Sequence, residues 1–513
     1  MANATQAFAG IPSHIRELGQ VFTEAGAEIA LVGGPVRDAF LGKIPHDFDL
    51  ATNARPERTE EILSRWADAT WDVGKEFGTI GARKGQLIVE ITTYRTEAYE
   101  VGSRKPEVTY GDTLEGDLTR RDFTVNAMAM RLPDMVLVDP HDGLVDLAYG
   151  RLRTPVSAEQ SFDDDPLRIM RAARFAAQLA IDVDYDVMCA MENMAHRLSI
   201  VSAERIRAEL ERLIISEHPR RGLELMVHTG VADIVLPEVA ALRETTDEHR
   251  RHKDVYEHTL TVVDQAIALE TGADGAVPAP DFILRFAALM HDVGKPDTRR
   301  FESDGSVSFH HHEIVGAKMT RKRMKALRFD KATTEAVSSL VALHLRFHGY
   351  GESAWTDSAV RRYVTDAGDL LERLHRLTRA DCTTRNRRKA QFLSQAYDDL
   401  EERIAALREK EALDAIRPDL DGGQVMQILG IRPSKAVKMA LDYLLSLRME
   451  RGPLGQEAAR EELLRWWESE DVREIAAEYQ KQQAHWEAQA AAKRARKHSH
   501  RSVTQDLSDE NTE

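Results

Sequence analysis

The stretch Leu31-Val32-Gly33-Gly34-Pro35-Val36-Arg37-Asp38 decides the fold of the N-terminal part of this chain. An apolar run that predicts a strand passes into two glycines and then into a predicted helix. Glycines let backbone N–H groups approach a phosphate closely, and a helix N-terminus adds positive potential. Arg37 would add a permanent charge. The stretch therefore predicts a phosphate-binding turn at Gly33, Gly34 and Arg37, although a plain strand–turn–helix corner has the same pattern.

A second motif, His46-Asp47-Phe48-Asp49-Leu50-Ala51-Thr52, follows on a predicted strand. Residues i and i+2 of a strand point to one face, so Asp47 and Asp49 place two carboxylates side by side. These charges repel unless a cation neutralises them, and Mg²⁺ prefers oxygen ligands. Glu90, on the predicted strand Leu87–Thr93, is a candidate third carboxylate, and a solvent-side Glu is an equal alternative. The set indicates phosphoryl or nucleotidyl transfer.

A third element, residues 118–129, mixes two arginines, an Asp and an Asn with an apolar pattern of helical spacing. Arg121 has the charge to hold a triphosphate. Asp122 and Asn126 have the polarity to bind a ribose. A salt-bridged helix start is the alternative for this element.

A fourth element begins at Asp165, which suits a helix cap, and Pro166, which suits a first turn. Arg168, Arg171 and Arg174 then follow at a spacing of three, which places three cations along one helical face. Without a bound anion these cations would repel one another. The element therefore predicts an anion-binding helix, and a surface helix balanced by neighbouring aspartates is the alternative.

Taken together and in this order, the four motifs resemble those of the class II tRNA nucleotidyltransferases, the bacterial CCA-adding enzymes. These enzymes share their head with bacterial poly(A) polymerases and the DNA polymerase beta-like superfamily. The resemblance implies stepwise addition of C, C and A to tRNA 3′ ends from CTP and ATP, with release of pyrophosphate. It implies that Asp47 and Asp49 hold Mg²⁺ and that Glu90 joins the catalytic set.

The resemblance also assigns the selection of the base. Asp165 and Arg168 match an Asp-x-x-Arg pair whose side chains hydrogen-bond the edge of the incoming base. Arg171 and Arg174 would support that pair or reach the triphosphate. CTP and ATP carry an exocyclic amino group that UTP and GTP lack at the matching position, so a carboxylate acceptor favours C and A. The chain has Asp164 where the family usually has Glu.

Three activities remain open within this family: full CCA addition, addition of CC or A only, and poly(A) synthesis. Residues 92–108 resemble the intact flexible loop of CCA-adding enzymes, which favours full CCA addition. A phosphohydrolase with an inactive head and an RNA-binding chaperone are the alternatives from other classes.

A cluster of histidines and aspartates occupies the middle of the chain. His291 and Asp292 end an apolar helix and are followed by Gly-Lys-Pro. Imidazole and carboxylate ligands suit Mn²⁺, Fe, Ni²⁺ or Zn²⁺. The cluster resembles the HD phosphohydrolase superfamily, which implies a transition-metal site made by His258, His291, Asp292, His312, His344 and Asp381. His312 is favoured over His310 and His311 because Glu313 follows it, as in that family.

Composition limits the class of protein. The chain has 513 residues, which predicts three or four domains. Its formal net charge of −16 excludes a uniformly basic nucleic-acid binder but allows local basic patches, such as residues 321–325 and 385–389. Two cysteines exclude a disulfide framework and favour the reducing cytoplasm. No run approaches the roughly 18 apolar residues of a membrane span, and the N-terminus does not resemble a secretory signal.

The expected fold class is α+β, with a DNA polymerase beta-like nucleotidyltransferase head on a long all-α body that includes an HD domain. Strands are expected at residues 28–32, 48–51, 78–82, 87–93 and 135–139. Helices are expected at residues 14–25, 58–67, 167–179, 203–215, 255–268, 282–290 and 361–373. The expected domains are a head at 1–150, a neck for base and RNA recognition at 151–245, an HD domain at 246–395, a tRNA-binding tail at 396–480 and a charged end at 481–513. The oligomeric state stays open.

Overall fold

The computed structural model describes residues 8, 10–45, 48–98, 107–245, 255–303, 306–347, 355–384, 386–411, 416–469, 472 and 481. Asp47 and positions 99–106 of the expected flexible loop lie outside the described residues. The chain forms two compact units. The first comprises Met1–His344 with Arg376–Thr383, and the second comprises Leu345–His375 with Thr384–Glu513. The expected HD range 246–395 therefore contributes to both units.

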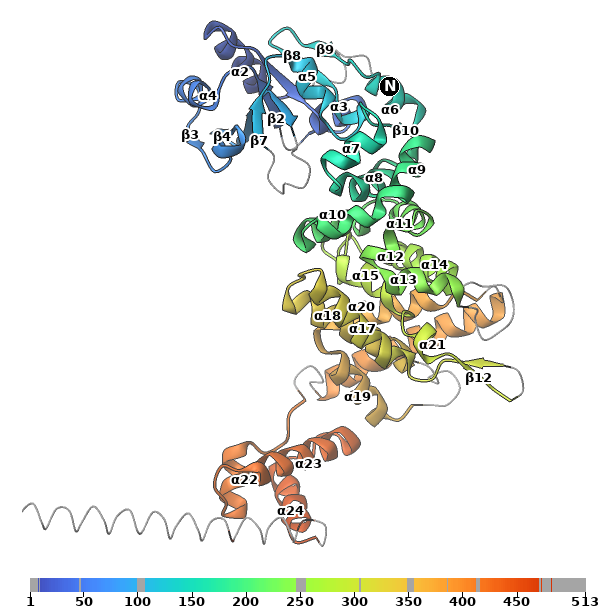
Figure 1. Ribbon diagram of the computed structural model, residues 1–513. Helices are drawn as coiled ribbons and strands as arrows, with labels where there is room; N and C mark the ends of the chain where they lie inside the picture. The colour runs from blue at the N-terminus through green and yellow to red at the C-terminus, as the bar shows by residue number, and fades with distance from the viewer. Residues whose placement is uncertain are drawn as a thin grey trace, which may run out of the picture. The chain divides into compact units, whose positions relative to one another are not determined.

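A mixed seven-stranded sheet forms the centre of the N-terminal part (Figure 1), with the strand order β3-β4-β5-β2-β1-β8-β9. Among these described strands, β2 and β5 pair in parallel and the other neighbours pair antiparallel. The strands are β1 (Ile29–Val32), β2 (Phe48–Thr52), β3 (Ala69–Trp71), β4 (Thr79–Lys84), β5 (Leu87–Thr93), β8 (Ala129–Leu132) and β9 (Val136–Val138). A separate hairpin consists of β6 (Arg95–Ala98) and β7 (Glu107–Tyr110).

Short helices pack on this sheet and make its core. They are α2 (Ser13–Glu24), α3 (Gly34–Phe40), α4 (Pro56–Leu63), α5 (Leu114–Thr119) and α6 (Gly143–Tyr149). The central strand β1 is buried along its whole length. Val32 packs in one cluster with Tyr94 and Leu118, which joins the glycine turn after β1 to the arginines that follow α5.

The apolar residues at helical spacing over residues 118–129 do not form a single helix. The segment forms the end of α5, a turn, a short 3₁₀ helix at Thr124–Asn126 and the start of β8. The apolar run misled because β8 lies between β1 and β9, and Met130 is fully buried. A strand covered on both faces is apolar at successive positions and loses its alternation.

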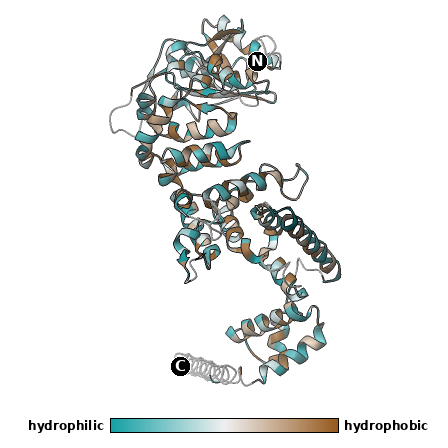
Figure 2. Cartoon of the chain, turned by 90° about the vertical axis from the view of Figure 1, so that its right-hand side faces the viewer, coloured by the Kyte–Doolittle hydropathy of each residue, from teal (hydrophilic) through white to brown (hydrophobic). Residues whose placement is uncertain are grey.

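Helices make up the rest of the first unit. They are α7 (Ala158–Asp164), α8 (Leu167–Leu179), α9 (Tyr185–Met194), α10 (Ala203–Ile214), α11 (Pro219–His228), α12 (Val231–Val235), α13 (Pro237–Ala240), α14 (Val255–Ala268), α15 (Phe282–Met290), α16 (Lys295–Thr298), α17 (His312–Ala326) and α18 (Lys331–Leu343). Two short pairings accompany them: parallel β10 (Arg151–Leu152) with β11 (Asp182–Val183), and antiparallel β12 (Arg300–Phe301) with β13 (Val307–Ser308). Figure 2 shows brown and teal residues mixed along most helices, which is typical of amphipathic packing.

The second unit is helical in its described part. Its helices are α19 (Asp357–Ala367), α21 (Arg387–Glu411), α22 (Gly422–Leu429), α23 (Lys435–Arg451) and α24 (Gln456–Trp467), and it contains the start of α20 (Leu371–Asp381). The expected single helix over residues 361–373 was wrong, because Gly368, with a positive φ of 50°, ends α19 and a new helix begins at Leu371. Among the helices in the described part of the chain, none combines the length and apolar character of a membrane span.

Gly143 shows how tightly α6 packs on the turn at Thr124–Asn126. A Cβ atom at Gly143 would lie 2.1 Å from the backbone oxygen of Thr124. We expect Gly143→Ala to destabilise the head by about 1–3 kcal/mol through overpacking. Thermal unfolding checks this against Gly272→Ala, whose added methyl group meets nothing within 4 Å. Equal melting temperatures for the two variants would contradict the packing seen here.

Candidate functional site

Two of the predicted carboxylates lie side by side in the sheet. Asp49 of β2 and Glu90 of β5 are register partners in neighbouring parallel strands. Both are exposed, whereas Leu50 and Ile91, the residues that follow them, are buried. Register partners point to the same face of a sheet, and adjacent strands lie about 4.8 Å apart. Two exposed carboxylates at this spacing fit an oxygen-liganded cation.

The glycine turn lies against two of the predicted arginines. Gly33 precedes α3 with φ of 74°, a conformation that favours glycine, and its N–H donates to the oxygen of Met128. A Cβ atom at Gly33 would lie 3.0 Å from Arg121 Nη1, and one at Gly34 would lie 3.7 Å from Arg37 Nη2. The structure therefore brings together the four residues that the sequence assigned to phosphate binding.

Each of these two arginines is held by protein groups. Arg37 is buried and donates from Nη1 to Asn126 Oδ1 at 2.6 Å and from Nε to Asp38 Oδ1 at 2.9 Å. Arg121 donates from Nη2 to Asp117 Oδ2 at 3.1 Å. Burial alone would raise the pKa of Asp117, but the charges of Arg121 and Arg120 outweigh it and lower that pKa. Asp117 thus stays ionised and fixes the arginine pair.

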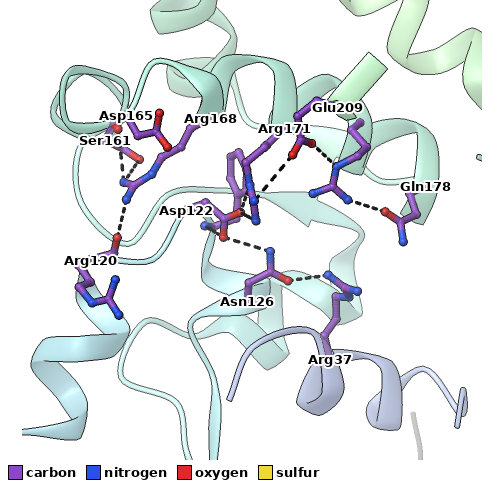
Figure 3. A network of polar contacts seen from close by, with 12 residues as sticks. Arg37, Arg120, Asp122, Asn126, Ser161, Asp165, Arg168, Arg171, Gln178 and Glu209 are labelled. Carbon is purple, nitrogen blue, oxygen red and sulfur yellow. Dashed lines mark hydrogen bonds and ion pairs between the residues drawn. The ribbon is translucent and has the colours of Figure 1, made fainter. Parts of the chain in front are cut away.

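Asp122 and Asn126 form the centre of a buried polar network (Figure 3). Asn126 donates from Nδ2 to Asp122 Oδ1 at 3.1 Å, and Arg171 donates from Nε to Asp122 Oδ2 at 2.8 Å. Burial would raise the pKa of Asp122, but Arg171 outweighs that effect and lowers the pKa. The two side chains that the sequence assigned to ribose binding therefore connect the turn near Arg37 to α8.

Neighbouring residues fix Asp165 and Arg168, the pair that the sequence predicts to read the base. Arg168 is buried, with Nη1 donating to Ser161 Oγ at 2.9 Å and Nη2 donating to the oxygen of Arg120 at 2.6 Å. Asp165 accepts from the N–H of Leu167 at 3.1 Å and from Arg205 Nη2 at 2.8 Å. The structure thus holds both side chains at the start of α8 in defined positions.

The arginine row on α8 corrects one expectation. The cations do not require a bound anion, because the protein itself neutralises them. Arg171 pairs with Asp122 Oδ2 at 2.6 Å, and Arg174 pairs with Glu209 Oε2 at 2.5 Å. Glu209 comes from α10, and its carboxylate also lies 3.9 Å from Arg171 Nη1. Figure 3 shows the resulting chain of contacts from Arg37 to Gln178.

Sequence reasoning did not single out Asp117 and Glu209. Asp117 precedes Arg120 and Arg121 by three and four residues, a spacing at which helical side chains meet. Glu209 lies between Ile206 and Leu210 on the apolar face of its helix, and an acid on a buried face signals a buried counter-charge. Both signals were present in the sequence.

The histidine–aspartate cluster forms a compact buried site in the first unit. His258 Nε2 lies 3.0 Å from Asp381 Oδ1 and 3.6 Å from Asp292 Oδ2. His291 Nε2 lies 3.1 Å from Asp292 Oδ2, and His312 Nε2 lies 3.3 Å from Asp292 Oδ1. Among the described residues, two groups could hold a metal ion, and Asp292 belongs to both. One is His258, His291 and Asp292, and the other is Asp292, His312 and His344.

Backbone contacts orient the imidazole rings toward this centre. The Nδ1 atoms of His291, His312 and His344 lie 2.8, 2.8 and 2.6 Å from the backbone oxygens of Ala288, Phe309 and Val341, respectively. When Nδ1–H donates to a carbonyl, the lone pair of the neutral ring lies on Nε2, as in histidines that bind a metal. The Nε2 atom of His344 is buried and has no hydrogen-bond partner among the described residues.

The carboxylates of Asp292 and Asp381 favour positively charged groups in this site. Burial would lower the pKa of His291, but Asp292 and Asp381 outweigh it and raise the pKa to about 10. Lys295 Nζ lies 2.8 Å from Asp292 Oδ2, and His258 Nδ1 lies 3.1 Å from Thr383 Oγ1, two neighbours that sequence reasoning did not assign. The donor set fits a transition-metal ion, because it combines imidazole nitrogens with a carboxylate that can bridge two ions.

Outside the cluster, His310 and His311 are exposed, and only His312 of the three faces Asp292. The basic patch at 321–325 is partly neutralised, since Arg321 pairs with Glu335 and Arg323 with Glu238. Arg387, which begins α21, is exposed, and Arg385 lies outside the described residues.

Removing Glu209 tests the buried pair in the neck. Glu209→Ala leaves the Arg174 charge buried without its partner, so we expect a loss of stability of about 3–5 kcal/mol. Denaturant unfolding measures it, and Glu211→Ala on the exposed side of the same helix is the matched control. The double change Arg174→Met with Glu209→Leu should recover most of the loss. A single variant as stable as the control would contradict the pairing.

A measurement of bound metal tests the role of Asp292, the carboxylate that belongs to both ligand groups. After incubation with Mn²⁺ and removal of free ions, elemental analysis should find the largest loss of bound metal in Asp292→Asn, because Asp292 belongs to both ligand groups. His312→Ala should lose only part of the metal, since it removes a ligand from one group. His311→Ala should bind as the unchanged protein does. Equal metal content in Asp292→Asn and His311→Ala would contradict the assignment.

Comparisons with known proteins place these sites in family domains. Residues 29–153 match the poly A polymerase head domain, residues 181–242 match the probable RNA and SrmB-binding site of polymerase A, and residues 255–386 match the HD domain. The matches to a nucleotidyltransferase head and an HD domain imply metal dependence, and the carboxylate and imidazole groups described above fit a metal ion.

Among solved structures, the Bacillus stearothermophilus CCA-adding enzyme in complex with CTP has a TM-score of 0.63 at 23% identity. The comparison covers 93% of this chain and all of that one. The Thermotoga maritima CCA-adding enzyme complexed with tRNA has a TM-score of 0.58 at 18% identity and covers 91% of this chain and 98% of that one. These likenesses establish the fold.

Two curated relatives have a higher sequence identity to this chain than these two solved structures have. A CCA-adding enzyme of Streptococcus pyogenes is 42% identical over 221 residues, which is 42% of this chain and 54% of that enzyme, so the chain matches about half of its length. The A-adding tRNA nucleotidyltransferase of Deinococcus radiodurans is 33% identical over 448 residues, or 86% of this chain and 95% of that enzyme. The chain therefore belongs to the bacterial tRNA nucleotidyltransferase family, whose head is shared with poly(A) polymerases, and it carries an HD domain.

Proposed function

We propose that this chain is a template-independent RNA polymerase that adds C, C and A to the 3′ ends of tRNA, using CTP and ATP and releasing pyrophosphate. The observation that carries the proposal is the register of Asp49 with Glu90, which places two exposed carboxylates on one face of the sheet. The head at 1–150 would perform the reaction, the neck at 151–245 would select the nucleotide, and the tail at 396–480 would grip tRNA.

The reaction needs the terminal hydroxyl of the RNA and the triphosphate to meet at these carboxylates. Mg²⁺, held by Asp49 together with Asp47, would make the hydroxyl more acidic and neutralise the charge of the departing pyrophosphate. Without side chains at Gly33 and Gly34, Arg121 and Arg37 lie close against the turn, where their charges could hold a phosphate. Asp117 keeps Arg121 oriented, so its charge is in position before the nucleotide binds.

Base selection rests on fixed partners at the start of α8. The Asp165 carboxylate can accept from the amino group of cytosine or adenine, while uracil and guanine lack a donor at that place. Arg205 and the Leu167 N–H hold Asp165, and Ser161 holds Arg168, so the pair cannot rearrange freely to suit a wrong base. This supports selection of C and A by the protein itself.

Addition of A alone is the second candidate, because the relative matched over almost its whole length is an A-adding enzyme. Three tRNA substrates distinguish the two: one lacking the last three nucleotides, one ending in C and one ending in CC. Incorporation of labelled CTP into the first two together with ATP into the third supports the full CCA activity, and incorporation of CTP alone would indicate CC addition. Incorporation of ATP into the third substrate alone would establish A addition. Long A tracts on unrelated RNA would instead indicate poly(A) synthesis.

The HD domain, expected at 246–395, would add a phosphohydrolase activity on phosphomonoesters or cyclic phosphodiesters. The Nε2 atom of His344, buried and without a partner in the described part of the chain, and the place of Asp292 in both ligand groups support a bound metal rather than an inert scaffold. Mn²⁺, Fe, Ni²⁺ and Zn²⁺ all suit this donor set, and a metal there would supply an activated water for hydrolysis.

Separate variants distinguish the two activities. We expect Asp49→Asn to lower nucleotide incorporation by at least about 100-fold, because it removes a metal-binding charge from the reacting centre. Hydrolysis of RNA with a 2′,3′-cyclic phosphate end should persist in Asp49→Asn and disappear in Asp292→Asn. Incorporation rates and phosphate release measure the two. Normal incorporation by Asp49→Asn would refute the role of this carboxylate.

A further inference from the structure

One row of the sheet crosses four strands and contains both carboxylates. Asp49 on β2 is in register with Glu90 on β5, Glu90 is in register with Gly81 on β4, and Gly81 is in register with Trp71 on the edge strand β3. Register partners point to the same face of a sheet. The indole of Trp71 therefore projects from the face that carries the two carboxylates.

Gly81 independently confirms this direction. A Cβ atom at Gly81 would lie 2.0 Å from Trp71 Nε1 and 2.1 Å from Trp71 Cε2. The indole thus covers the position where a side chain of Gly81 would stand, and glycine is required there for it to lie against the strand. The next position along the row toward Asp49 is occupied by Glu90.

Around Trp71 and Glu90, the face of the sheet that carries them is less covered than the opposite face. Ile80 and Ala82, which flank Gly81 and point to the opposite face, are fully buried. Trp71 keeps part of its surface exposed, and Ile88, which shares the face of Glu90, is 53% exposed. Exposed apolar surface on the face that carries the two carboxylates indicates a contact with an apolar part of a ligand.

The reaction limits what that ligand can be. The RNA must bring its terminal 3′-hydroxyl to Asp49 and Glu90, while Asp165 and Arg168 take the base of the incoming nucleotide from α8. Two strand spacings, about 10 Å, separate the backbones at Glu90 and Trp71. A nucleotide whose ribose is at the carboxylates reaches that distance with its base. The exposed π-face of an indole is a good stacking partner for such a base.

On this basis, and resting on the proposed nucleotidyl transfer, we infer that Trp71 stacks on the 3′-terminal base of the RNA that is being extended. Stacking tolerates every base, because each presents a π-face. This property suits an enzyme whose RNA end changes after each addition, since the same contact serves every step. The incoming base, by contrast, is read through hydrogen bonds at Asp165 and Arg168.

The test combines a change in the protein with a change in the RNA. Two tRNA substrates lacking the last three nucleotides are compared, one normal and one whose terminal nucleotide has a ribose but no base. With the normal substrate, Trp71→Ala should lower kcat/KM for the RNA by roughly 5- to 150-fold, and Trp71→Phe should retain most of the rate. With the abasic substrate, the unchanged protein and Trp71→Ala should react equally.

Trp71→Leu keeps an apolar cover over Gly81 without a π-face, so it should fold and behave as Trp71→Ala does. Val73→Ala, a change at an 85% exposed apolar position shortly after β3, is the matched control and should leave both rates unchanged. An equal loss on both substrates would mean that Trp71 only supports the sheet, and no loss on either would exclude the contact. Both results overturn the inference while incorporation by the unchanged protein still stands as evidence for the proposed function.

Discussion

The buried pairing of Arg171 with Asp122 is the interaction on which the proposed active site depends. It joins a turn of the head to the first long helix of the neck, through a carboxylate that is 8% exposed. Around it, Asn126 reaches back to Arg37 and Glu209 reaches on to Arg174, so that one chain of polar contacts passes from α3 to α10. Each charge in this chain has its counter-charge, which is the condition for burying it.

This network gives the neck a role in positioning the start of α8. If the base is read by Asp165 and Arg168, the helix that carries them must keep a fixed distance from the carboxylates in the sheet. Hydrophobic packing alone is tolerant of small shifts, whereas hydrogen-bonded ion pairs fix both distance and orientation. The α8 arginines thereby link the base-reading turn to the same segment, residues 120–126, that lies against the glycine turn.

The charged groups of the HD site are arranged differently from those of the head–neck network. In the head–neck network the charges balance within the protein, while around Asp292 and Asp381 the acids raise the pKa of His291 and so favour an added positive charge. The imidazole rings are turned toward the centre by backbone carbonyls, and Nε2 of His344 faces it without a protein partner among the described residues. The HD site thus combines a strongly shifted pKa with a buried ring nitrogen that has no protein partner among the described residues, a combination typical of a ligand site.

The sequence alone predicted many of the strands and helices and the types of the candidate functional side chains. Local patterns report on residues that are neighbours at spacings of two, three or four, so they correctly predicted the strand at Leu87–Thr93 and the helix at Leu167–Leu179. The same patterns identified the carboxylates, the arginines and the histidines by type. They failed for β8, where burial on both faces removes the alternation of a strand.

Only the tertiary structure decided which of these groups meet. The register of Asp49 with Glu90, the pairing of Arg174 with Glu209 and the covering of Gly81 by Trp71 all join segments that are distant along the chain or belong to different strands. No periodic pattern specifies such contacts, because they depend on how whole elements pack and on which strands become neighbours. The sequence therefore supplied the chemical groups, and the strand order of the sheet and the packing of α8 on α10 determined their partners.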